Sequence, residues 1–150
     1  MKLKNVSKIV LWCAEEVEHQ KDGPLDVSSM FNAWRFYTSI ADATRFEERV
    51  LEGDILTLAT ILKGYGNYRT IPVGFSNGDF AIAPAVVGQA IHSLLTHQDN
   101  LTALEFYIEF ERIHPFVDGN GRIGSILFNY LNGTLDKPVH VPLPTDFQWR

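Results

Sequence analysis

Residues 114–122 of the chain have the sequence His-Pro-Phe-Val-Asp-Gly-Asn-Gly-Arg, and this short stretch separates two apolar segments with helical spacing. Pro115 opposes continuation of the preceding helix, and the two glycines let backbone N–H groups approach a ligand closely. A helix that starts at about Arg122 would turn its N-terminus, with its partial positive charge and free N–H donors, toward this loop. The stretch therefore predicts an anion-binding loop between two helices.

The side chains of the same stretch add reactive chemistry to the loop. Arg122 carries a planar fork of donors suited to phosphate oxygens. Asp118 offers a hard oxygen ligand of the kind that Mg²⁺ shares with substrate phosphates and water. His114 is the side chain there that accepts a proton near neutral pH. A base, a metal ligand and an anion cradle within nine residues predict phosphoryl or nucleotidyl transfer.

Two other interpretations of the loop are weaker. Residues 118–121 partly match the start of an EF-hand calcium loop, which would need an acidic or amide residue at Arg122, Gly at Ile123 and Glu at Asn129. All three positions fail. A glycine-rich turn without a ligand is the other alternative, and the coincidence of the glycines with His, Asp, Asn and Arg argues against it.

The rest of the chain predicts an all-α fold, because apolar residues recur three and four positions apart. The expected helices cover residues 6–18, 29–44, 54–64, 86–95, 102–113 and 123–131. Asp54 is expected to cap the start of the third helix and Gly64 to end it. The fifth helix is apolar nearly all round, which is typical of a central helix.

One segment departs from helical spacing. Strand-type residues from Tyr68 to Phe75 precede the turn sequence Ser-Asn-Gly-Asp at residues 76–79, and Phe80 and Ile82 follow it. The pattern predicts a short β-hairpin. Because an isolated hairpin is only marginally stable, it is expected to lie against the helices.

Composition indicates one soluble globular domain over residues 1–150. Apolar residues make up 45% and charged residues 21% of the chain, and the formal net charge of −5 disfavours binding to nucleic acid. No signal peptide or apolar run of roughly 18 residues is recognised, so we expect a cytoplasmic protein without a membrane partner. The single cysteine, Cys13, lies among apolar residues and is expected to be a buried, inert thiol.

The stretch at residues 114–122 resembles the signature of the Fic family, HPFx(D/E)GNGRxxR, with eight specified residues matching in one block. The resemblance extends over about residues 54–133. It implies a Fic-type helical bundle with a short β-hairpin flap that aligns a target chain beside the active site. The flap residues that it implies are Ile71, Pro72, Val73, Gly74 and Phe75.

The resemblance also implies a function: a protein nucleotidyl transferase that moves AMP, or another NMP, onto a Ser, Thr or Tyr hydroxyl of a target protein. ATP would be the donor and Mg²⁺ the cofactor. His114 would be the general base, Asp118 would hold the metal against the phosphates, and Phe116 would be a buried anchor for the loop. The implied nucleotide-binding positions are Gly119, Asn120, Gly121, Arg122 and Ser125.

Ser125 is the departure from the family pattern, which has a second arginine at that position. A charged contact to phosphate contributes roughly 1.5–3 kcal/mol, so we expect a weaker grip on ATP unless another residue substitutes. Ser125 leaves open a Doc-like protein kinase toxin, which lacks this arginine but has lysine at the position of Gly121. A catalytically silent binding module is a third alternative, against which the intact His114, Asp118 and Arg122 argue.

The inhibitory pattern of self-regulated members, Ser or Thr followed four residues later by Glu and then by Gly or Asn, does not occur in the chain. Its nearest match is Thr44 with Glu48, which Arg49 follows. We therefore expect no control by an internal glutamate, and consider a separate antitoxin-like inhibitor as a partner besides the target protein.

Overall fold

The computed structural model describes residues 6–19, 26–42, 49–75 and 78–141 of the chain. Within them it has six α-helices, two short 3-10 helices and no β-strand, so the predicted all-α class is confirmed. The helices are α1 (Val6–His19), α2 (Asp26–Asp42), α3 (Glu52–Lys63), α4 (Val87–Thr96), α5 (Ala103–Ile113) and α6 (Asn120–Leu131), with 3-10 helices at Pro84–Val86 and Gln98–Asn100.

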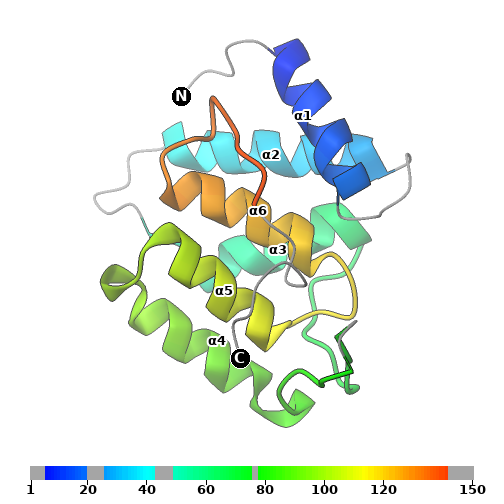
Figure 1. Cartoon of the computed structure of the whole chain (residues 1–150), viewed down its shortest axis with the longest axis vertical. Coiled ribbons are helices and arrows are strands. Elements are labelled where there is room, and N and C mark those ends of the chain that lie inside the picture. The colour runs from blue at the N-terminus through cyan, green and yellow to red at the C-terminus, as the bar shows by residue number, and fades with distance from the viewer. Residues whose placement is uncertain (1–5, 20–25, 43–48, 76–77, 142–150) are drawn as a thin grey trace.

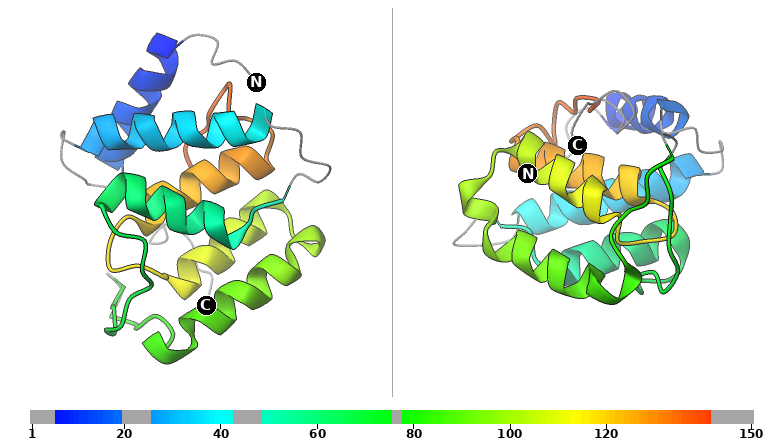
Figure 2. Two further views of the ribbon diagram at one scale, coloured as in Figure 1. Left: turned by 180° about the vertical axis from the view of Figure 1, so that it is seen from behind. Right: turned by 60° about the horizontal axis from the view of Figure 1, so that its bottom comes forward.

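Helix α6 occupies the middle of the bundle. In Figure 1 it lies between α2 and α5, with α4 beyond α5 and α1 packed on the far side of α2. The view from behind in Figure 2 shows α3 crossing the opposite side of α6, and α3 also contacts α2 and α4. This arrangement leaves the N-terminal end of α6 beside the segments that connect α3 to α4 and α5 to α6.

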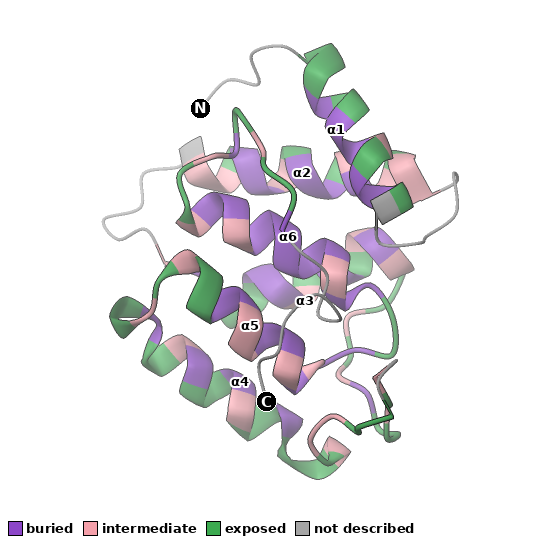
Figure 3. Cartoon of the chain, in the orientation of Figure 1, coloured by how far each residue is buried: buried purple, intermediate pink, exposed green. Residues whose placement is uncertain are grey.

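The prediction that residues 102–113 form the central helix is wrong. Nine of the twelve residues of α6 are buried, against five of the eleven in α5, and Figure 3 shows the same difference along the two ribbons. Small residues allow this. A Cβ atom added at Gly124 would lie 3.0 Å from the ring of Tyr107, so α5 can approach α6 this closely only because Gly124 has no side chain.

The start of α3 also differs in detail from the prediction. Leu51 is the cap residue, and Asp54 lies three positions inside the helix, where its carboxylate accepts hydrogen bonds from the Leu51 N–H at 3.0 Å and the Tyr37 hydroxyl at 3.2 Å. The carboxylate thus satisfies a backbone donor from inside the helix and ties α3 to α2. The predicted end of the helix at Gly64 is confirmed.

The predicted β-hairpin is reduced to a single antiparallel bridge between Gly74 and Phe80. Two backbone hydrogen bonds flank it, from Phe75 N to Asp79 O and from Ala81 N to Val73 O. Pro72 has no N–H to donate, which opposes extension of a strand ladder on that side. Residues 76 and 77 of the predicted turn lie outside the described residues.

The segment after α6 returns to the first two helices. Leu135 accepts a hydrogen bond from the buried indole of Trp34 at 3.1 Å, and the ring of His140 stacks on that of Trp12 at 5.2 Å. His140 also bonds the buried carboxylate of Glu16. The neighbouring Cys13 is fully buried, which confirms the predicted burial, and burial raises the pKa of its thiol to about 12.

None of the helices in the described ranges has the length and apolar character that a membrane crossing requires.

His140 makes fold stability depend on pH. Burial disfavours the charged imidazole, but hydrogen bonds and charge from Glu16 and Glu15 outweigh it and raise the pKa of His140. The stabilisation is therefore complete below about pH 6.5, the unfolded value, and is lost as the pH rises through the folded pKa. We expect His140→Gln to lower the free energy of unfolding by about 1 kcal/mol at pH 6 and by less at pH 9, where the imidazole is no longer charged. The effect at pH 6 is small because the ring is one-third exposed and water screens its pairs with the two carboxylates.

Urea unfolding of both proteins at the two pH values measures this difference, and His92→Gln, an exposed histidine on α4, is the control. A loss that does not change with pH would contradict the ion-pair explanation.

Candidate active site

A cavity of about 110 Å³ opens at the N-terminal end of α6. Its volume is several times the ~30 Å³ share of one water molecule and well below the roughly 300 Å³ at which pockets for whole small molecules begin. The space therefore suits a phosphate-sized anionic group. The residues that line it are His114, Val117, Asp118, Gly119, Asn120, Gly121 and Arg122.

The loop closes onto α6 through Gly119. Gly119 precedes the helix with φ of 85°, a left-handed conformation that favours glycine, and the side chain of Asp118 accepts its N–H at 2.8 Å. The first turn of a helix leaves backbone N–H groups without intrahelical partners and carries partial positive charge. The end of α6 is therefore electrostatically suited to an anion, as the sequence predicts.

His114 ends α5 in an unusual backbone conformation. Its φ of 49° and ψ of 64° are left-handed, and no other non-glycine residue in the described ranges has a positive φ. Such a conformation persists only where the surroundings hold it. Arg69 does so, because its Nε donates to the His114 carbonyl at 2.6 Å and its backbone N–H donates to the Pro115 carbonyl at 2.9 Å.

The ring of His114 is mostly buried and uncharged at neutral pH. Burial lowers its pKa below 6.5 against the opposing influence of the Glu111 backbone, and the charge of Arg69 acts with burial while that of Asp118 acts against it. The ring of Phe75 meets that of His114 edge-on, with centroids 5.3 Å apart. A neutral imidazole beside an anion site has the protonation state that a general base needs.

Glu111 lies one turn before His114 and is buried at 2% exposure. Its Oε2 is 3.8 Å from Nδ1 of His114, and within the described structure neither that Nδ1 nor the Oε1 of Glu111 has a hydrogen-bond partner. Burial raises the pKa of Glu111 to about 8, so the carboxyl group is largely protonated at pH 7.

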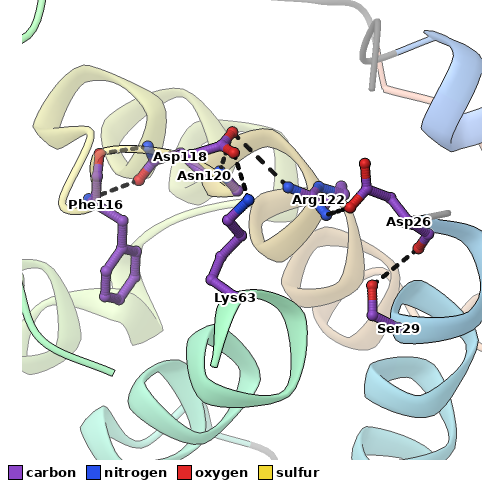
Figure 4. A network of polar contacts seen from close by, with 8 residues as sticks. Asp26, Ser29, Lys63, Phe116, Asp118, Asn120 and Arg122 are labelled. Atoms are coloured by element: carbon purple, nitrogen blue, oxygen red, sulfur yellow. Dashed lines mark hydrogen bonds and ion pairs between the residues drawn. The ribbon is translucent and has the colours of Figure 1, made fainter. Parts of the chain in front are cut away.

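Four charged residues form a chain of contacts that alternates in sign (Figure 4), and two of them, Asp118 and Arg122, line the cavity. Lys63, the last residue of α3, donates to Asp118 at 2.6 Å. Arg122 lies 3.8 Å from the other oxygen of Asp118 and 3.3 Å from Asp26 at the start of α2. Burial opposes ionisation of Asp118, but Lys63, the Gly119 N–H and Arg122 together lower its pKa, so its carboxylate is charged.

Asn120 and Phe116 hold the loop in shape. The Asn120 side chain is buried and accepts from the Phe116 N–H at 2.9 Å while donating to the Phe116 carbonyl at 2.8 Å. Its amide is thus engaged by the loop, which leaves its backbone for a ligand. Phe116 is 1% exposed and contacts the ring of Tyr68, as expected for an anchor.

Ser125 is not brought to the cavity. It is fully buried, and its hydroxyl donates to the Arg122 carbonyl at 3.1 Å. Ser125 lies in the second turn of α6 and is not among the residues that line the cavity.

The expected flap residues, 71–75, follow Arg69 and include Gly74, which forms the bridge to Phe80. The carbonyl of Ile71 accepts from the Arg69 guanidinium at 3.0 Å, while the side chains of Ile71 and Pro72 are exposed. Of the five residues, Phe75 is the one with a ring contact to His114.

Sequence reasoning missed Lys63, Glu111 and Asp26, and it did not assign Arg69 to the site. Glu111 precedes His114 by three positions, so helical spacing could have placed it on the same face. Lys63 and Asp26 are distant in sequence and carry no such signal. The weak match at Thr44 and Glu48 lies outside the described residues.

Across the described part of the chain, no group of three or more His, Cys, Asp or Glu side chains could enclose a metal ion. A single carboxylate such as Asp118, half exposed at the cavity, instead fits the mode of Mg²⁺, which takes one or two carboxylates together with phosphates and water.

The sequence profile of the Fic/DOC family matches residues 47–131. A relative from Aquifex aeolicus (strain VF5), named probable protein adenylyltransferase aq_aa38, is 29% identical over 143 residues, which cover 81% of this chain and 44% of the relative. A Fido domain-containing protein of Dictyostelium discoideum is 49% identical over 37 residues, covering 25% of this chain and 26% of the relative. The chain thus spans less than half the length of these relatives.

Solved structures share the fold. A Fic family protein from Desulfovibrio desulfuricans G20 superposes with a TM-score of 0.61 at 24% identity, covering 87% of this chain and 46% of that one. A Fic domain containing signaling protein from Bacteroides thetaiotaomicron gives 0.57 at 24% identity, covering 71% and 46%. At these identities the likeness establishes the arrangement of the helices.

The raised pKa of Glu111 predicts a second pH-dependent contribution to stability. The folded state keeps the proton up to about pH 8 whereas the unfolded state loses it near 4.5, so stability falls as the pH rises between these values. Glu111→Gln is nearly isosteric and cannot ionise. We expect its free energy of unfolding relative to wild type to rise by roughly 3–5 kcal/mol between pH 4.5 and pH 8.5.

Denaturant unfolding over that range measures the difference. Glu18→Gln, an exposed carboxylate on α1, should follow the wild-type curve, and parallel curves for Glu111→Gln and wild type would rule out a buried neutral acid.

Proposed function

The chain belongs to the Fic/DOC family, and from this premise we propose that it is a protein nucleotidyl transferase that moves AMP from ATP onto a Ser, Thr or Tyr hydroxyl of a target protein. The one observation that carries the proposal is the shared cavity, where the neutral base His114 faces the anion-binding end of α6. The Aquifex aeolicus relative is named a probable protein adenylyltransferase, which supports ATP as the donor of an AMP group.

The chemistry follows from where each group lies. His114 accepts the proton of the incoming hydroxyl as its oxygen attacks the α-phosphorus, and the bond to the pyrophosphate breaks. Negative charge that builds on the phosphates is met by the N-terminal end of α6 and by Arg122, which are already in place before the reaction. The carboxyl of Glu111 lies 3.8 Å from Nδ1 of His114, close to the ring but beyond hydrogen-bond distance.

Asp118 would hold Mg²⁺, which supplies neutralisation of phosphate charge when bound. Its carboxylate is charged, half exposed and a lining residue of the cavity, which supports this role. The segment 71–75 would align the target chain, since Phe75 contacts the ring of His114 from that side.

The Doc-like alternative, transfer of the γ-phosphate, keeps one observation in its favour, because Ser125 is buried away from the cavity and cannot bind an outer phosphate. Gly121 favours AMP transfer, because the Doc-like toxins have lysine at this position.

Mass spectrometry of cell lysate incubated with the protein and each nucleoside triphosphate distinguishes AMP transfer from phosphate transfer, since AMP and phosphate add different masses to the target. Absence of any added mass would favour a binding module, and a separate inhibitor protein would be sought by copurification.

Replacing the base tests the mechanism. We expect His114→Ala to lower transfer by on the order of 10²–10⁴ while ATP binding remains, because general-base catalysis contributes about that much. In wild type, kcat/KM should fall as the pH drops through the lowered pKa of His114, below 6.5, since protonation removes the base. His92→Ala, an exposed histidine, is the control, and full activity of His114→Ala would exclude this base.

Removing the metal tests Asp118. We expect EDTA to silence the wild type and Asp118→Asn to require far more Mg²⁺ for half-maximal transfer, since the amide keeps the shape but loses the charge that attracts the ion. A Mg²⁺ titration of activity measures both, with Asp136→Asn as an exposed acidic control. Transfer activity that EDTA does not change would exclude a role for Asp118 in metal binding.

A further inference from the structure

Helix α6 carries one arginine of the two that the family signature has. Ser125 stands where the family signature has an arginine, and its side chain is fully buried with its hydroxyl on the Arg122 carbonyl. Arg122 is thus the cation that α6 brings to the cavity, and its charge is already shared between Asp26 and Asp118. A triphosphate with its metal would meet less positive charge from α6 than the signature provides.

Helix α3 supplies a cation from the opposite side. The side chain of Lys63 rises from the end of α3 and crosses the loop to reach Asp118 (Figure 4). A Cβ atom at Gly119 would lie 3.4 Å from Cγ of Lys63 and 3.6 Å from Nη2 of Arg122, so the two cations approach the same glycine from different elements. The stem of Lys63 is packed on the loop, and its side chain is only 24% exposed.

The position and chemistry of Lys63 suit a flexible side chain that binds phosphate. An ammonium on a four-carbon stem is a compact point charge with three rotatable donors. A metal ion on Asp118 would compete for the carboxylate oxygen that Lys63 now contacts, and would free the ammonium beside the phosphates that the same ion binds.

We infer that Lys63 is the second phosphate-binding cation of this site, contacting the outer phosphates of the nucleotide in place of an arginine at position 125. This inference rests on the proposed nucleotide transfer. It gives Lys63 a role in binding the nucleotide. A lysine with only a structural role would hold the loop in place through its contact with Asp118.

Calorimetry on the full chain with Mg²⁺ tests it, using ATP, AMP and inorganic triphosphate as ligands. We expect Lys63→Met to weaken ATP and inorganic triphosphate at least tenfold, the size of one charge-assisted contact, and to leave AMP nearly unchanged. Lys63→Arg should retain most of the ATP affinity. Lys8→Met, an exposed lysine on α1, is the matched control. Lys63→Gln, which can still donate to Asp118, replaces Lys63→Met if that variant does not fold.

The outcomes separate the two ideas. Equal ATP affinity in wild type and the folded Lys63 variants overturns the inference and leaves the transferase proposal standing. Equal weakening of ATP and AMP also overturns it, because it indicates a distorted loop instead of a lost phosphate contact. A wild type that binds neither ATP nor inorganic triphosphate overturns the inference together with the transferase proposal.

Discussion

The guanidinium of Arg69 is the interaction on which the active-site loop depends. It is buried at 3% exposure and donates to the carbonyls of Ile71, Ile82, Ile113 and His114. The last carbonyls of a helix lack partners and attract a cation, so one side chain both ends α5 and ties the segment before α4 to it. Burying a charge is costly, and these four acceptors offset that cost. The left-handed His114 can persist because this clamp fixes its carbonyl.

The charged residues around the cavity depend on the loop that Arg69 holds in place. Asp26, Arg122, Asp118 and Lys63 come from three different helices and the loop, and each neutralises its neighbour. Arg122 is buried at 1% exposure between two partly exposed carboxylates, so its pairs with Asp26 and Asp118 offset the cost of burying its charge and hold charged groups ready at the cavity. In the proposed function a metal–triphosphate complex would replace these contacts with contacts to the ligand, whereas in the free protein Arg122 and Lys63 each lie beside a carboxylate.

The helices and the reactive loop could be predicted because their sequence signals are local. Apolar spacing marks each helix, and the proline, the glycines and the polar residues of the loop all lie within residues 114–122. The hairpin was overestimated: strand-type residues around Phe75 indicate β-structure, but the described residues form a single bridge there, and Pro72 has no N–H to donate to a longer ladder. Lys63 could not be foreseen, because its pairing with Asp118 spans 55 positions and arises from how α3 crosses α6. Glu111 was within reach of helical spacing, but its burial depends on Gly124.

The exchange of a fixed arginine for a lysine on another helix changes what the site can do. An arginine on α6 would present a rigid, planar fork to the phosphates whether or not a metal is present. Lys63 instead pairs with Asp118, the residue proposed to hold the metal, so its ammonium becomes available only when that carboxylate finds another cation. If Asp118 holds the metal as proposed, metal and phosphate binding would be coupled through this carboxylate, because Lys63 would lose its partner there and its ammonium would be available to the phosphates. A nucleotide without its metal would have to displace Lys63 from Asp118 unaided, which favours the metal–nucleotide complex as the species that binds.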